Sequence, residues 1–148
     1  MDREYPKVYL YKRIVQAKLY MDTNFSGQPD LNNIADEAWF SKFHFIRLFK
    51  KIYGKTPHQY LIGVRIEKAK ELLQLGVSIT EVCLGVGFES TSTFTGLFKR
   101  YTKVTPSAYQ QQHLQRQEEI KQTPLKFIPN CFAESKGWTK NSNFEEAD

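Results

Sequence analysis

Two stretches of the chain carry the same pattern: residues 41–60 read SKFHFIRLFKKIYGKTPHQY, and residues 90–109 read STSTFTGLFKRYTKVTPSAY. Seven pairs of identical residues that define the pattern lie 49 residues apart. The matched pairs are Ser41 and Ser90, Phe45 and Phe94, Phe49 and Phe98, Lys50 and Lys99, Thr56 and Thr105, Pro57 and Pro106, and Tyr60 and Tyr109. Just upstream, an offset of 48 residues matches Leu31, Ile34 and Ala35 with Ile79, Val82 and Cys83. The chain therefore contains a duplicated structural unit.

Each copy predicts a short helix, a turn and a longer helix. Side chains that can cap helix starts precede the short helices at 31–38 and 79–85 and the longer ones that follow. These predicted caps are Asp30, Ser41, Ser78 and Ser90. Apolar residues on each longer helix recur at i, i+3, i+4 and i+7, which predicts a side that faces the core. They are Phe45, Leu48, Phe49 and Ile52 in the first copy, and Phe94, Leu97, Phe98 and Tyr101 in the second.

Three further helices and a tail complete the expected fold. A helix over residues 7–24 has an apolar stripe of Val8, Tyr11, Ile14, Val15, Leu19 and Met21. Thr-Pro pairs begin a linker helix over 57–75 and a last helix to about Gln117. We expect an all-α protein with two helix-turn-helix subdomains, at about 8–55 and 78–112, joined by that linker helix. A polar, irregular tail at 118–148 follows, with an apolar island at 125–132.

Composition argues against a membrane protein or an enzyme. The chain of 148 residues has no apolar run near the roughly 18 residues of a membrane span, and its start is not a signal peptide. Cys83, read as a core residue, and Cys131 are too few for a disulfide framework, which fits a cytoplasmic protein. His44 and His58 lack further metal ligands, and no catalytic motif or carboxylate pair stands out. We expect no cofactor, no metal and no catalytic residue.

The net charge of +5 is unevenly distributed along the chain. Residues 31–116 carry 12 Lys and Arg against 6 Asp and Glu, whereas residues 117–148 carry 4 against 6. The basic excess therefore lies on the duplicated unit, as binding to a nucleic-acid backbone requires. A charge of this size is also found on soluble domains that bind no nucleic acid, so it favours DNA binding without establishing it.

If the Phe-rich sides face the core, helix geometry places other side chains outward. These are Lys42, Phe43, Ile46, Arg47 and Lys50 in the first copy, and Thr91, Ser92, Thr95, Gly96 and Lys99 in the second. A recognition helix meets base edges in the major groove with its N-terminal outward residues. Arg47 has the fork that suits guanine, and Phe43 and Ile46 can touch thymine methyl groups. The cations toward the helix ends are expected to bind phosphates; they are Lys50, Lys51, Lys99 and Arg100.

The second unit carries the most specific signature: SITEVCLGVGFES at 78–90, then Phe94-x-x-x-Phe98-Lys99, then VTPSAY at 104–109. Over about residues 8–112 the sequence resembles the DNA-binding domain of the AraC/XylS family of bacterial transcription regulators. The stretch YLIGVRIEKAKELL at 60–73 is similar to that family's linker helix. The resemblance implies two recognition helices in successive major-groove segments on one face of double-stranded DNA. It also implies regulation of transcription through contact with RNA polymerase, and we expect this regulation to be activation. Carried over by position, Lys42, Phe43, Ile46 and Arg47 would read one segment, and Thr91, Ser92 and Thr95 the other.

Three features depart from that family's pattern. Gly96 stands where several members carry a base-reading arginine, and Lys103 replaces the glycine usual before the Val-Thr-Pro turn. We expect no sensor domain of the kind typical of the family, since only about 30 residues of this sequence precede the first unit. The chain is either a stand-alone regulator or the output domain of a larger protein.

Two other functions remain as alternatives. The chain could bind another protein, having lost strong DNA reading; Gly96 and the apolar tail island motivate this hypothesis. It could also be an enzyme that uses the domain to reach DNA, but Cys131 has no neighbouring His or Arg to activate it as a nucleophile. The tail carries a net charge of −2, so we expect it to be dispensable for DNA recognition.

Overall fold

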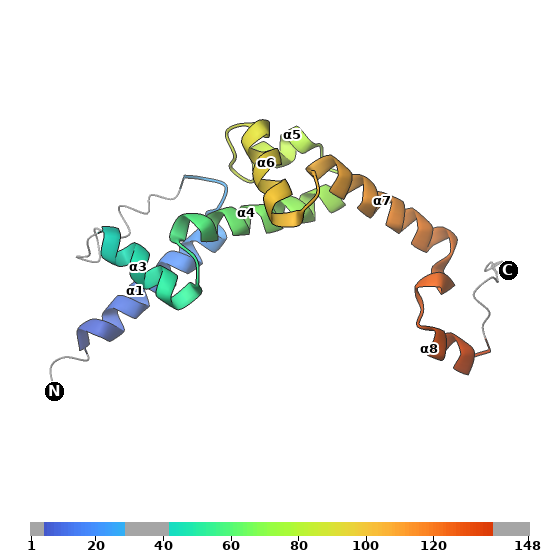
Figure 1. Cartoon of the computed structure of the whole chain (residues 1–148), viewed down its shortest axis with the longest axis horizontal. Helices are drawn as coiled ribbons and strands as arrows, with labels where there is room; N and C mark the ends of the chain where they lie inside the picture. The colour runs from blue at the N-terminus through green and yellow to red at the C-terminus, as the bar shows by residue number, and fades with distance from the viewer. Residues whose placement is uncertain (1–4, 29–41, 138–148) are drawn as a thin grey trace.

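The computed structural model describes residues 5–28 and 42–137, and these residues form helices and turns without a strand. The molecule is elongated, with α1 and α3 toward one end and α8 at the other (Figure 1). Its elements are α1 (Tyr5–Thr23), α3 (Lys42–Tyr53), α4 (Pro57–Gln74), α5 (Ile79–Gly85), α6 (Thr91–Thr102), α7 (Pro106–Gln122), the 3-10 turn η1 (Pro124–Phe127) and α8 (Asn130–Ser135). The predicted all-α class is confirmed.

Side-chain caps begin the helices where the sequence predicts them. Thr56 Oγ1 accepts a hydrogen bond from the backbone N–H of Gln59 at 3.2 Å, and Gln59 Oε1 accepts one from the N–H of Thr56 at 3.0 Å. Ser78 and Glu81 form the same reciprocal capping box at the start of α5. Proline follows both Thr56 and Thr105, so α4 and α7 begin with a preset backbone and a satisfied cap.

Two apolar clusters hold the helices together. The first joins α1, α3 and the start of α4 through buried Ile14, Ala17, Met21, Phe45, Phe49 and Leu61. The second joins the rest of α4 to α5 and α6 through buried Ile66, Ala69, Leu73, Val82, Cys83, Val86, Phe88, Phe94 and Phe98. Because α4 contributes to both clusters, it links two helical units, as the predicted linker helix requires. Cys83 is a core residue, and burial raises the pKa of its thiol.

The predicted stripe of α1 is only partly correct. Ile14 and Met21 are buried, but the remaining four residues are exposed: Val8, Tyr11, Val15 and Leu19. The face that packs on the first cluster uses Ala17 as its middle contact, at the helical spacing i, i+3 and i+7. Apolar residues lie on several sides of this helix, so their periodicity does not select the side that is buried.

The last core position predicted on each longer helix is also wrong. Ile52 is 38% exposed and Tyr101 is 40% exposed, although the two Phe residues before each are fully buried. Both lie in the last turn of their helix, beyond the buried part of the cluster. Tyr101 instead reaches across to α4, where its hydroxyl donates to the carbonyl oxygen of Gln59 at 3.3 Å.

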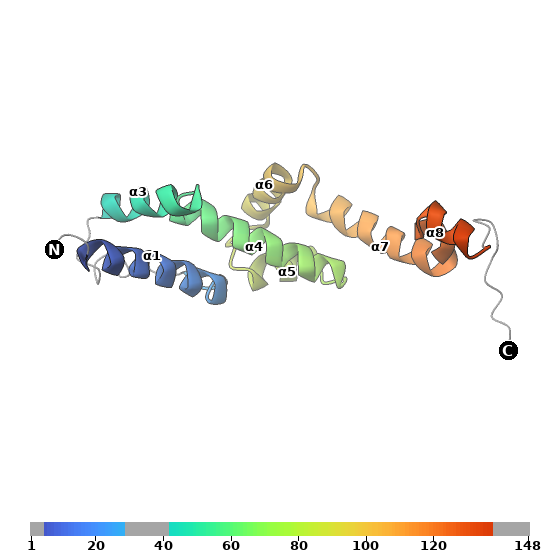
Figure 2. The same cartoon turned by 90° about the horizontal axis from the view of Figure 1, so that it is seen from below.

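The C-terminal region is more regular than predicted. The last helix, α7, ends at Gln122 rather than near Gln117, so the expected tail boundary falls inside a helix. Between Pro124 and Ser135 the tail forms the 3-10 turn η1 and the short helix α8. Both lie at the far end of α7 from α1 (Figures 1 and 2).

Some sequence predictions lie outside the described residues. These are the helix at 31–38 with its cap Asp30, the turn at 39–40, the cap Ser41, and the end of the tail from 138. In the part of the chain that is described, none of the helices has the length and apolar character needed to cross a membrane.

The two units touch where the loop after α1 meets the turn between α5 and α6. Gly87 has a left-handed backbone, with φ +94°, and a Cβ at this position would lie 2.6 Å from the carbonyl oxygen of Ser26. Beside it, Gln28 Nε2 donates to Glu89 Oε1 at 2.8 Å. Glycine is therefore required at position 87 both by the backbone and by the close approach of the loop.

Replacing Gly87 tests this contact. Gly87→Ala is expected to lower the free energy of unfolding by about 2–4 kcal/mol, because it adds a strained backbone and a clash with a main-chain carbonyl. Urea unfolding followed by circular dichroism measures the loss. Gly85→Ala is the matched control, since a Cβ there meets nothing within 4 Å and the backbone is not left-handed. Equal losses in the two variants would contradict the assignment.

Candidate nucleic-acid interface

The outward side of α3 is basic and carries one large exposed ring. Phe43 is 75% exposed. Four cations are exposed on the same helix: Lys42, Arg47, Lys50 and Lys51. Ile46, predicted to face outward, is half-buried and packs against the first cluster, so its side chain is only partly available. The sequence-predicted set on α3 therefore forms one surface, with Ile46 at its margin.

The outward side of α6 has smaller side chains. Thr91, Ser92, Lys99 and Arg100 are exposed, and Thr95 is half-buried. Moving by 49 residues pairs Arg47 of α3 with Gly96 of α6 and Phe43 with Ser92. A Cβ at Gly96 would meet nothing within 4 Å. The second helix thus presents hydroxyls and a bare backbone at the positions where the first presents a ring and a guanidinium.

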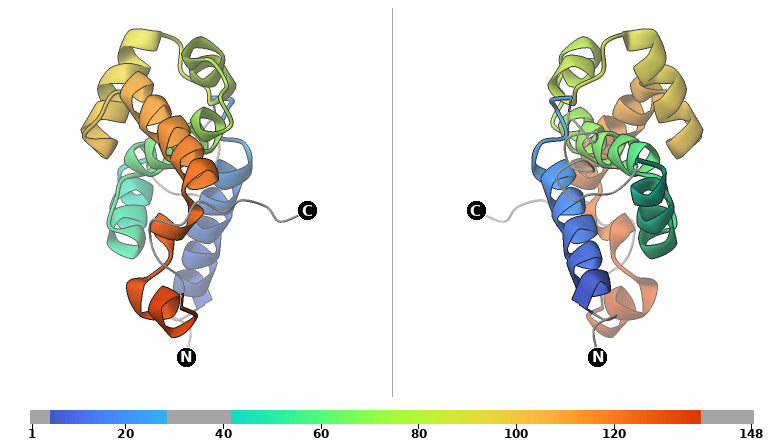
Figure 3. Two further views of the ribbon diagram at one scale, coloured as in Figure 1. Left: turned by 90° about the vertical axis from the view of Figure 1, so that its right-hand side faces the viewer. Right: turned by 90° about the vertical axis from the view of Figure 1, so that its left-hand side faces the viewer.

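The helices α3 and α6 lie on the same side of the molecule. Seen from below, both are on one side of α4, and α1 and α5 are on the other (Figure 2). The views along the long axis agree (Figure 3). A straight partner that runs along this side of α4 would therefore pass both helices.

Arg65 of α4 fixes how the two units sit on each other. Its Nε donates to the carbonyl oxygen of Phe25 and its Nη2 to that of Gly27, each at 2.7 Å. The guanidinium also lies over the ring of Phe88, with 5.6 Å from Cζ to the ring centroid. Burial lowers the pKa of Arg65 from its usual value, but a guanidinium remains charged at neutral pH. This one side chain contacts the loop after α1 and the turn before α6.

The paired tyrosines hold the ends of the linker helix in equivalent ways. Tyr60 packs edge-on against Phe49 with 5.7 Å between ring centroids, and Tyr109 packs likewise against Phe98 at 5.5 Å. The hydroxyl of Tyr60 donates to Asp22 Oδ1 at 2.7 Å. Burial, followed by this hydrogen bond, raises the pKa of Tyr60.

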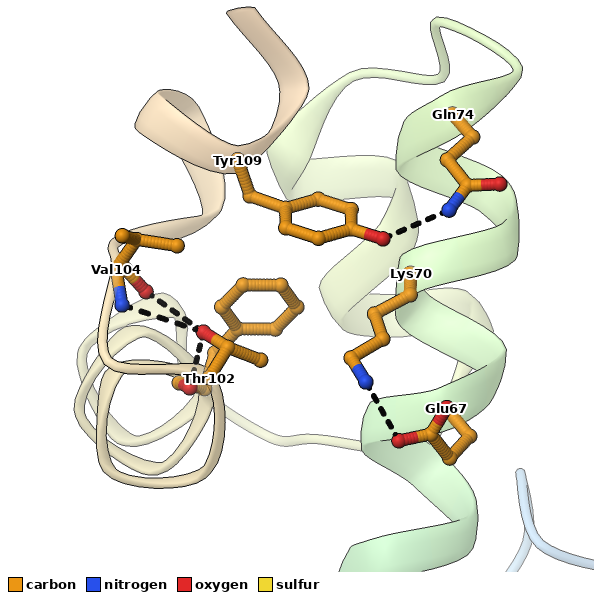
Figure 4. A network of polar contacts seen from close by, with 7 residues as sticks. Glu67, Lys70, Gln74, Thr102, Val104 and Tyr109 are labelled. Atoms are coloured by element: carbon orange, nitrogen blue, oxygen red, sulfur yellow. Dashed lines mark hydrogen bonds and ion pairs between the residues drawn. The ribbon is translucent and has the colours of Figure 1, made fainter. Parts of the chain in front are cut away.

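Two contacts join α7 to the second half of α4. The hydroxyl of Tyr109 accepts a hydrogen bond from Gln74 Nε2 at 2.7 Å (Figure 4). Gln110 Nε2 donates to the carbonyl oxygens of Leu73 and Val77 at 3.1 and 2.8 Å. Near the end of α6, Thr102 Oγ1 lies 2.8 Å from the carbonyl oxygen of Phe98 and closes the last turn. The frame behind α6 is thus held by hydrogen bonds as well as by the apolar cluster.

Thr93 borders the outward side of α6 and is not among the residues predicted from the sequence. Its side chain is exposed and lines a groove of about 300 Å³ between α4 and α6, together with His58 and Arg65. Its Oγ1 lies 2.9 Å from Ser90 Oγ, the N-cap of α6. Helical periodicity places Thr93 beside the outward side, and only the position of α4 shows that it borders a groove. Within the described ranges, no three His, Cys, Asp or Glu side chains come together as a metal site.

A family model described as a helix-turn-helix domain matches residues 34–112. The transposon Tn10 TetD protein of Escherichia coli is 37% identical over 102 residues, which cover 68% of this chain and 74% of TetD. The activator AarP of Providencia stuartii is 31% identical over 97 residues, covering 65% of this chain and 72% of AarP. The bifunctional transcriptional activator/DNA repair enzyme AdaA of Bacillus subtilis is 37% identical over 93 residues, but the match spans only 44% of AdaA and 62% of this chain.

Solved structures show the same architecture. The DNA-binding domain of the global transcriptional factor AdpA, in a crystal structure with a target DNA, superposes with a TM-score of 0.66 and 28% identity. That match covers 72% of this chain and 96% of the AdpA domain. The C-terminal domain of the response regulator AraT from Geobacillus stearothermophilus gives 0.63 at 27% identity, covering 68% and 84%. The chain belongs to the family of AraC-type helix-turn-helix transcription regulators.

Proposed function

We propose that the chain regulates transcription by reading two successive major-groove segments of double-stranded DNA, one with α3 and one with α6. The observation that carries this proposal is the placement of both helices on one side of the frame formed by α4 (Figures 2 and 3). Sequence-specific DNA binding is the function of the family, and the AdpA domain is seen with its target DNA. The placement of α3 and α6 supports the more specific proposal that the chain reads two groove segments at once.

The two helices have different roles in this proposal. On α3, Arg47 donates to the O6 and N7 acceptors of a guanine, and exposed Phe43 touches a thymine methyl group. Ile46 contributes at the edge of that contact. On α6, only the hydroxyls of Thr91, Ser92 and Thr95 can reach base edges, so the second segment is read less sharply. The cations in the last turns of both helices bind phosphates: Lys50, Lys51, Lys99 and Arg100.

We further propose that the regulator is an activator that contacts RNA polymerase while bound to DNA. Two observations support activation: the family membership, and the relatives named as activators, AarP and AdaA. A repair activity like the one in AdaA's name is not part of the proposal, because the match covers less than half of that protein. In vitro transcription from a promoter with a selected site tests activation directly.

The first test concerns the charge of the interface. If about six phosphates are neutralised, a plot of log K against log salt for the full chain on duplex DNA should have a slope near about −5. Fluorescence anisotropy over a series of salt concentrations gives this slope. A flat response, or no binding at low salt, would show that the basic faces of α3 and α6 do not meet DNA.

The second test compares the two helices on a site obtained by in vitro selection. Arg47→Ala is expected to cost about 1–3 kcal/mol of binding free energy and to relax the preference at one base pair. Thr95→Ala is expected to cost less, because a half-buried hydroxyl makes at most one weaker contact. Both positions are outside the buried clusters, so circular dichroism should show unchanged folding. A larger loss for Thr95→Ala would reverse the assigned roles.

A further inference from the structure

Lys103 has an unusual backbone. Its φ is 70° and its ψ is −3°, which is the left-handed region, and it is the only residue other than glycine with a positive φ in the described segments. It ends α6, with its backbone N–H donating to the carbonyl oxygen of Lys99 at 2.8 Å. A side chain is strained in this conformation, whereas glycine adopts it freely.

The duplication shows which residue this position accepts without strain. Gly54, 49 residues earlier, ends α3 in the same way. Its φ is 73°, and its N–H donates to the carbonyl oxygen of Lys50 at 2.8 Å. The two caps have the same geometry, yet the first copy has glycine and the second has lysine. The lysine is therefore not needed to form the cap.

Contacts within the chain do not account for the lysine either. The Lys103 side chain is exposed, and its Nζ lies 3.4 Å from the carbonyl oxygen of Arg100, near the outer limit for a hydrogen bond. The salt bridges found in the described ranges are elsewhere. Residues 90–117 contain no Asp or Glu that could pair with it. Within the described part of the chain, no contact compensates for the strained backbone of Lys103. We therefore look for a contact with a binding partner.

The location of Lys103 indicates what that function is. It follows Lys99 by one helical turn, on the outward side that also carries Gly96, and Lys99 and Arg100 are exposed beside it. The three cations together make the C-terminal end of α6 strongly basic. A recognition helix contacts base edges with its N-terminal residues, and in homeodomains the C-terminal end of the reading helix contacts the DNA backbone.

We propose that Lys103 binds a DNA phosphate next to the groove segment contacted by α6, and that its left-handed backbone is retained for this contact. The inference rests on the proposed function of α6. Gly96 explains why this contact matters. Because α6 has no long side chain at the centre of its outward side, its binding to DNA depends on phosphate contacts at the end of the helix. Lys103 then positions α6 and does not distinguish bases.

Lys103→Gly removes the strain and the charge together, and each loss has its own readout: the strain in the unfolding midpoint and the charge in DNA binding. In the full chain we expect a higher urea midpoint of unfolding. On the selected site at about 0.1 M salt we expect roughly 5–10-fold weaker binding, with a log–log salt slope less steep by about 0.9, the contribution of one phosphate. Lys103→Arg should keep the salt slope of the wild type. Asparagine tolerates this backbone but is uncharged, so Lys103→Asn should show the same less steep slope as the glycine variant.

Lys121→Gln is the control for a general effect of net charge. It removes one exposed cation at the far end of α7, and at about 0.1 M salt such a distant charge is screened, so affinity and slope should not change. A Lys103→Gly variant that is more stable but binds DNA like the wild type would overturn the proposal, as would one that is less stable than the wild type. If the wild type itself fails to bind DNA at low salt, the proposed function fails, and this inference fails with it.

Discussion

The arrangement of the two units depends on the half-buried guanidinium of Arg65. It donates two short hydrogen bonds to the loop after α1 and lies over the ring of Phe88 in the turn before α6. A planar group with several donors can make these contacts at once, which a lysine ammonium cannot do. Phe25, whose carbonyl accepts one of the bonds, packs against both apolar clusters. The close approach of Gly87 to the backbone of Ser26 is a further contact between the two units.

A fixed joint matters for recognition of two groove segments. If the two units moved independently, binding the second segment would require ordering the linker, and part of the binding free energy would be lost. Here α4 belongs to both clusters, and α3 and α6 already lie on one side of it. The protein can therefore present both helices to DNA with little change of its own shape.

The duplication preserves the frame and changes the surface. Tyr60 and Tyr109 keep the same ring packing in both copies. The outward positions have diverged: Arg47 corresponds to Gly96, and Gly54 corresponds to Lys103. The first copy thus has the side chain that can read a base and an unstrained cap. The second has neither, and its positive charge is gathered at the end of α6.

The amino-acid sequence by itself determined the described helices from α1 to α7, most of their starts and the pairing of the two units, but not η1 and α8. Caps such as Thr56 and Ser78 act through hydrogen bonds within three residues, and the Phe stripes repeat at helical spacing, so both are visible locally. Only the tertiary structure decided which side of α1 is buried and that Ile46 is half-covered. It also decided that Arg65 joins the units, since a bond between residues about 40 positions apart leaves no periodic trace. Burial and long-range contacts depend on which elements meet, and that is a property of the folded chain as a whole.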